Sequence, residues 1–176
     1  MIQIRATTIW LSLLTPLAFS CEDSGVGINT KGGWAIYRLS DPSITSYQIR
    51  NVPLSELTLA PVPFIASRDI HSYDWETHTF ECSAEAVGRL DSLSRHEGSV
   101  YGRPFVVTVD GTRIYYGSFW WDYSSLLQWC PFINTSFPWG STHRTIHLPP
   151  VYQGNDPRSD IRIYYSLKAS GLLTNE

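Results

Sequence analysis

The clearest pattern of apolar and polar positions along the chain lies within residues 104–120. Two runs rich in β-branched and aromatic residues, 105–109 and 112–116, are separated by Asp110 and Gly111. Both positions of the tightest two-residue hairpin turn adopt positive φ, which is why Asp-Gly between such runs is a preferred turn sequence. The pattern therefore predicts an antiparallel β-hairpin.

A different spacing follows Ser83 and predicts a helix. Ser83 can accept a hydrogen bond from a free amide of the first turn, Glu85 lies in that positively polarised turn, and Gly98 ends the run. The apolar positions that share one face at helical spacing are Ala86, Val87, Leu90 and Leu93. We therefore expect an amphipathic helix with this face in the core.

The segment 160–172 carries two conflicting patterns. Its apolar residues alternate as in a strand, whereas Asp160 at its start and Gly171 at its end are typical of helix caps. We predict a helix here.

Further strands are predicted where aromatic and β-branched residues are dense. These segments are 34–39, 44–52, 73–82 and 145–148. Three prolines make 53–63 irregular, and 124–141 is expected to be mostly loop. The fold class that follows is α+β, a small antiparallel sheet with one or two packed helices, in a single globular domain of residues 34–173.

The N-terminus predicts export. Arg5 precedes an uncharged stretch, 6–19, which is shorter than the ~20 residues that a membrane-spanning helix needs. We expect residues 1–20 to be removed as a signal peptide. Residues 21–33, which contain four glycines, then form a flexible tether.

Two cleavage sites remain open. Ala18 and Ser20 fit the small-x-small rule of ordinary signal peptidase, which would leave a soluble secreted or periplasmic protein. The same residues followed by Cys21 resemble a bacterial lipobox, although Ala18 stands where Leu is usual. Lipidation of Cys21, which we favour, would anchor the protein to a membrane of the cell envelope through its acyl chains.

Composition narrows the function. The chain is 43% apolar and 16% charged, which suits a packed core and excludes general disorder. Its net charge of -3 gives no basic footprint, so nucleic acid is not an expected partner. A nucleophile elbow, a P-loop, a dinucleotide fingerprint and a CxxC pair are all missing from the sequence, so we assign no catalytic residue and no cofactor.

One polar cluster allows an alternative. Its members are Asp69, His71, Asp74, Glu76 and His78. His71, Asp74 and His78 are the candidate metal ligands of a metal-dependent or hydrolytic envelope enzyme. Their spacing matches no established zinc motif, and we favour a polar turn whose side chains cap backbone groups.

Aromatic residues gather between 119 and 139. Neighbouring side chains of an extended chain point to opposite faces, so large rings here can be exposed. Exposed Trp and Tyr stack on glycan rings or anchor protein partners. The candidate binding face consists of Trp120, Trp121, Tyr123 and Trp129. For these rings we favour packing in the core over exposure. The function we favour is a non-catalytic protein- or glycan-binding module.

The number of cysteines predicts a disulfide bond. If Cys21 is lipidated in an oxidising compartment, Cys82 and Cys130 remain as an even pair. We expect a disulfide between them; the alternative is two buried free thiols.

Three stretches, 72–80, 104–120 and 156–171, resemble small bacterial exported proteins and lipoproteins with no assigned activity. The resemblance implies export and agrees with the α+β fold. It implies no catalytic residue.

Overall fold

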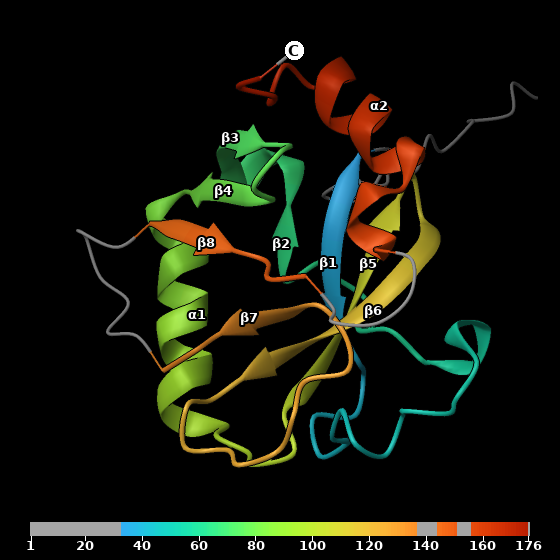
Figure 1. Cartoon of the computed structure of the whole chain (residues 1–176), viewed down its shortest axis with the longest axis vertical. Helices are drawn as coiled ribbons and strands as arrows, with labels where there is room; N and C mark the ends of the chain where they lie inside the picture. Colours follow the sequence, from blue (N-terminus) through green and yellow to red (C-terminus); the bar gives the residue numbers. More distant parts are fainter. Residues whose placement is uncertain (1–32, 137–143, 151–155, 176) are drawn as a thin grey trace, which may run out of the picture. The chain divides into compact units, whose positions relative to one another are not determined.

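The described part of the chain, in a computed structural model, comprises residues 33–136, 144–150 and 156–175 (Figure 1). All of these residues belong to one compact unit that spans residues 31–176. The predicted signal peptide, Cys21 and all of the predicted tether except Gly33 lie outside the described residues.

A five-stranded sheet carries the predicted hairpin. Its strands are β1 (Trp34–Arg38), β2 (Ile65–Ala66), β5 (Arg103–Val109), β6 (Thr112–Trp120) and β7 (Phe132–Asn134). Their order is β2-β1-β5-β6-β7, in which β7 runs parallel to β6 and the other pairs are antiparallel. Asp110 and Gly111 join β5 to β6 with φ values of 50° and 77°, which confirms the turn.

A second, antiparallel sheet has three strands in the order β3-β4-β8. They are β3 (Ile70–Asp74), β4 (Thr79–Cys82) and β8 (Thr145–His147). The C-terminal segment covers the free edge of β3, because the Tyr73 amide donates to the Leu172 carbonyl at 2.7 Å and the Thr174 amide donates to the Tyr73 carbonyl at 3.0 Å.

Two α-helices confirm the capping signals. α1 (Ala84–His96) begins where the Ser83 hydroxyl accepts from the Ala86 amide, and α2 (Ile161–Ala169) begins where Asp160 accepts from the Arg162 amide. The 3-10 helices are η1 (Leu54–Glu56), η2 (Ser67–Asp69) and η3 (Pro157–Ser159). Two helices with mixed and antiparallel sheets make the fold α+β, as predicted.

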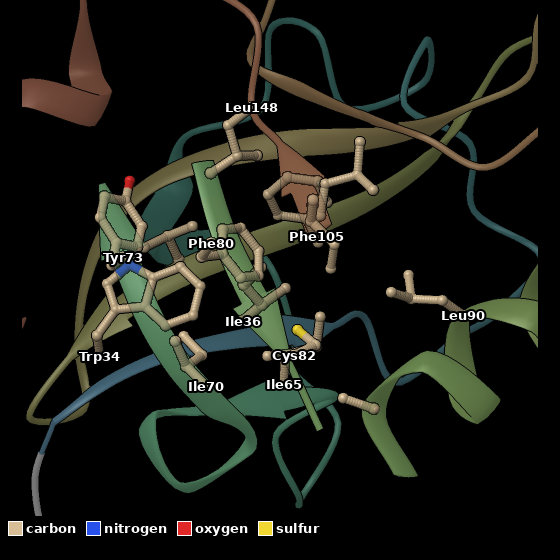
Figure 2. Packing of buried hydrophobic residues seen from close by; sticks show 14 of the residues in the cluster. Trp34, Ile36, Ile65, Ile70, Tyr73, Phe80, Cys82, Leu90, Phe105 and Leu148 are labelled. Atoms are coloured by element: carbon tan, nitrogen blue, oxygen red, sulfur yellow. The ribbon is translucent and has the colours of Figure 1, made fainter. Parts of the chain in front are cut away.

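The core is built around aromatic rings (Figure 2). Trp34 of β1 meets Phe80 of β4 edge-on with centroids 5.5 Å apart, and Phe80 stacks on Tyr73 of β3 at 5.8 Å. The predicted face of α1 is buried in the same cluster. The cluster therefore joins both sheets and α1 into one hydrophobic core.

The predicted strand at 44–52 is wrong. Successive turns replace it, with the Gln48 amide donating to the Thr45 carbonyl at 3.1 Å and the Val52 amide donating to the Ile49 carbonyl at 2.9 Å. β1 is already paired on both edges, by β2 and β5, so it cannot accept this segment as a neighbour. Ile49 is buried with Leu39 in a smaller hydrophobic cluster instead.

The predicted strand at 73–82 is a hairpin in the structure. Residues 75–78 form its turn, and His78 adopts a φ of 51°, in the left-handed region. The prediction of loop at 124–141 also missed β7, which is only three residues long and pairs with a strand by a parallel ladder. Three residues are too few for a strand pattern of apolar and polar positions to be recognised in the sequence.

Candidate functional site

The polar cluster at 69–78 is divided among separate structural roles. The Asp69 carboxylate accepts from the Ala66 amide at 2.8 Å and pairs with Arg89 of α1 at 2.8 Å. Asp69 therefore ties the η2 turn to the helix.

Asp74 caps the β3–β4 turn. Its carboxylate accepts from the amides of Glu76 at 2.9 Å and Thr77 at 3.0 Å, and the bond from Thr77 leads the interactions that lower its pKa. His71 is exposed on β3. Within the described ranges, no three His, Cys, Asp or Glu side chains are grouped so that they could hold a metal ion. The structure thus does not bring His71, Asp74 and His78 together as a ligand set, and the backbone-capping interpretation is confirmed for Asp74.

His78 is buried among aromatic rings. Its Nδ1 lies 3.1 Å from the Tyr73 hydroxyl, and its ring centroid lies 5.2 Å from that of Trp75. Burial lowers the pKa of His78 to about 4, and the nearby Arg158 guanidinium acts in the same direction. His78 is therefore neutral at neutral pH and serves as a packed, hydrogen-bonded side chain.

Arg158 is the buried cation of this region. It pairs with Asp156, with Nε 2.8 Å from Oδ1, and also donates to the Leu148 carbonyl. This bonding holds η3 against the chain that leaves β8. Because the Arg158 charge is already paired with the Asp156 carboxylate, we assign Arg158 a structural role.

Both described cysteines are free thiols, so the predicted disulfide is wrong. Cys82 ends β4 in the three-stranded sheet, whereas Cys130 precedes β7 in the five-stranded sheet. Each is buried separately, and burial raises the pKa of each thiol to about 12. The alternative of two buried, unreactive thiols is the one that the structure contains.

Two of the four candidate binding-face residues are also buried. Trp120 and Trp121 are each 2% exposed, so they belong to the core, the interpretation favoured from the sequence, and the candidate binding-face role is wrong for both. The Trp121 indole donates to the Ser94 carbonyl of α1 at 3.3 Å, and the Trp120 ring meets Trp129 edge-on at 5.9 Å. These two rings fill space beneath the loops of the domain.

Tyr123, in contrast, is 60% exposed and belongs to a larger apolar surface. We call this the aromatic loop surface. It comprises the exposed residues Tyr47, Val100, Tyr101, Tyr123 and Leu127, with the partly buried Trp129. They come from three loops, residues 40–53, 97–102 and 121–131, which follow β1, α1 and β6. Figure 1 shows these loops on the lower side of the five-stranded sheet.

Direct contacts hold the three loops together. Tyr47 lies beside Tyr101 and Trp129, with centroid distances of 5.8 and 6.1 Å. The Ser124 hydroxyl donates to the Val100 carbonyl at 2.6 Å. Rings from segments far apart in sequence thus form one surface.

A cation completes the surface. The guanidinium carbon of Arg50 lies 5.6 Å from the centroid of the Trp129 ring, a cation–π geometry. No carboxylate among the residues that the structure describes forms an ion pair with Arg50.

The sequence interpretation found only Tyr123 and Trp129 of this surface. Val100 and Tyr101 could have been noticed, because they are apolar residues in a short loop directly after the helix stop at Gly98. Tyr47 and Arg50 give no such signal, because they lie in segment 44–52, whose composition predicts a strand that does not form.

A groove of about 290 Å³ also lies between β7 and β8. Its described lining is Phe132, Ile133, Asn134, Thr145, Ile146, His147 and Pro149. His147 is the one titratable side chain among them, and an acid–base pair would need a second. The described lining of the groove therefore does not supply an acid–base pair, and we take the aromatic loop surface as the candidate functional site.

The fold and this surface define a class: an α+β domain that presents aromatic side chains on three adjoining loops. Comparison with protein-family models, with curated proteins and with solved structures finds no match. Among the described residues, no helix has the length and apolar character needed to span a bilayer.

Proposed function

We propose that this protein is exported, is anchored to an envelope membrane by lipid on Cys21, and acts as a non-catalytic protein- or glycan-binding module. The aromatic loop surface is its binding face. The observation that carries the proposal is the contact of exposed Tyr47 with both exposed Tyr101 and partly buried Trp129.

Exposure of this kind favours a binding role. Single exposed apolar side chains are common, but a contiguous group is typical of interaction sites. Tyr, Trp and Arg are also the residues that contribute most to binding energy at interfaces. Tyr47, Trp129 and Arg50 supply all three types in contact with one another.

The surface is supported by buried anchors. Ser46 donates its amide to the Gly102 carbonyl at 3.2 Å, and its hydroxyl lies 2.7 Å from that of Ser118 in β6. Ile49 and Trp121 are buried beneath the same loops. Because the loops are already held in place, binding a partner should cost little conformational entropy for ordering them.

Export and lipidation are supported by the N-terminal pattern that ends at Cys21. We expect mass spectrometry of the membrane fraction to find a mature N-terminus at Cys21 with a diacylglyceryl thioether. Cys21→Ala should move the protein out of the membrane fraction, while Cys82→Ala should not. An unmodified thiol at a mature Cys21 would remove the anchor from the proposal.

Binding is tested with the full chain by formaldehyde cross-linking in cells and by co-sedimentation with isolated cell-wall glycan. Tyr101→Ala should weaken whichever signal the wild-type protein gives, and Tyr165→Ala, which alters an exposed ring on α2, should not. Signals that are absent, or equal in all three proteins, would contradict the binding role.

A further inference from the structure

We infer that the partner of the aromatic loop surface is a different protein, which presents a carboxylate to Arg50. This inference rests on the proposed binding function and specifies its ligand. Three features of the surface carry it: the arrangement of the rings, the exposed aliphatic side chains and the charge of Arg50.

Trp129, Tyr47 and Tyr101 do not form a flat platform for sugars. A sugar that stacks on an aromatic side chain needs an open, flat ring face. Arg50 covers the Trp129 ring, whose planes with Trp120 and Tyr47 make angles of 90° and 82°. Tyr47 and Tyr101 are tilted by 50° to each other. Such tilted rings suit interdigitation with the side chains of a protein.

The aliphatic members point to the same class of partner. Leu127 is 86% exposed and Val100 is 43% exposed. Neither side chain can hydrogen-bond to a sugar hydroxyl, and covering a hydroxyl without a partner costs free energy. Apolar side chains of a protein would remove both residues from water without that cost.

Arg50 adds a charge requirement. Its guanidinium is held over Trp129, which fixes its position but leaves its positive charge without a carboxylate among the described side chains. Guanidinium groups bind carboxylates through paired N–H donors, and a positioned one loses less entropy on doing so. A partner with Asp or Glu at this point would complete the interface.

A second copy that met Arg50 symmetrically, through the same three loops, would not offer an unengaged carboxylate. The acidic side chains of the three loops are already engaged: Glu97 accepts from Arg38 at 2.9 Å, Asp41 from the Ser43 amide at 2.8 Å and Asp122 from the Asn134 amide group at 2.5 Å. Each is therefore already partly satisfied within its own chain, whereas an unpaired Asp or Glu of another protein would gain its first cationic partner. The carboxylate is therefore expected from another protein.

The test is site-specific photo-cross-linking of the full chain in cells, with Tyr123→p-benzoylphenylalanine. We expect a covalent adduct with another protein, identified by mass spectrometry of the joined peptides. In the same background, Arg50→Ala should reduce the adduct about tenfold, since a charged hydrogen bond of this kind is commonly of that size. Arg50→Lys should restore part of it, and Arg162→Ala on α2 should leave it unchanged.

Every other result of this cross-linking experiment contradicts either the inferred partner or the proposed binding function. An adduct with glycan, an adduct with a second copy of this chain, or a protein adduct that is equal in wild type and Arg50→Ala overturns the inference and leaves the binding function standing. No adduct at all overturns both. The thermal midpoint of Arg50→Ala, measured in parallel, should match that of Arg50→Lys, which shows that any loss reflects charge and not unfolding.

Discussion

The indole Nε1 of Trp121 donates a hydrogen bond to the backbone carbonyl of Ser94, 3.3 Å away in α1. Trp121 follows β6, so this bond ties the end of the long hairpin to the helix. Both Trp121 and its neighbour Trp120 are buried, and they support the loop that carries exposed Tyr123. Within this aromatic segment, the buried Trp120 and Trp121 therefore support the loop, whereas exposed Tyr123 is available to contact a partner.

This separation predicts opposite results from neighbouring substitutions. Trp121→Ala should lower the free energy of unfolding by about 3–5 kcal/mol, because it removes a buried ring and leaves a cavity. Tyr123→Ala should change it by roughly 0.5 kcal/mol or less, as an exposed position. Urea denaturation measures both values. Similar losses in the two variants would show that the division into support and contact is wrong.

His78 makes stability depend on pH. Above pH 6.5 His78 is neutral in both states, but between about pH 6.5 and 4 the unfolded chain takes up a proton that the folded chain, with a pKa of about 4, does not. Stability should therefore fall as the pH falls, by ~2 kcal/mol from this group between roughly pH 7 and 5.

A matched pair of variants isolates that contribution. His78→Asn removes the titrating ring and keeps a residue that tolerates the positive φ of this position. His71→Asn, at an exposed position of β3, should keep the wild-type dependence. If His78→Asn loses as much stability as wild type on acidification, buried His78 is not the cause.

Two glycines should respond to alanine in opposite directions. A Cβ on Gly117 of β6 would meet the Phe105 ring and lie 2.6 Å from the Pro131 carbonyl oxygen, beside the β6–β7 ladder. Gly117→Ala should cost about 2–3 kcal/mol through this overlap. Gly88 is exposed in α1 with nothing within 4 Å of its Cβ position, so Gly88→Ala should add about 0.5–1 kcal/mol. Thermal melting distinguishes them, and a tolerated Gly117→Ala would mean that β7 packs less closely than observed.

The buried thiols give a chemical prediction. Cys82 and Cys130 should resist iodoacetamide in the folded protein and react fully after denaturation without reductant. Peptide mass mapping reports each site separately. A denatured, unreduced sample in which both remain unmodified and joined would show a disulfide.

The sequence predicted those elements whose signals are local. Ser83 marks the start of α1, and Asp110-Gly111 marks the hairpin, because a cap and a turn are decided by a few adjacent residues. α2 follows the same rule at Asp160. These elements needed no knowledge of their neighbours.

The sequence predictions were wrong for segments whose conformation depends on pairing with distant parts of the chain. Segment 44–52 has the composition of a strand, but both edges of the preceding strand β1 are already paired, by β2 and β5. β7 forms because its three residues pair with the edge of β6, and the β propensity of three residues alone would not predict a strand. The candidate surface shows the same limit: Tyr47 and Tyr101 are far apart in sequence and are brought together only by the packing of two loops.

The central claim is that the aromatic loop surface is occupied by a partner in the cell. Hydroxyl-radical footprinting of the full chain, in intact cells and after purification, measures this without knowledge of the partner. We predict that labelling of Tyr47, Tyr101 and Tyr123 is several-fold lower in cells than in the purified protein, whereas labelling of exposed Tyr165 on α2 is the same in both. Equal labelling of all four tyrosines in the two samples would contradict the account.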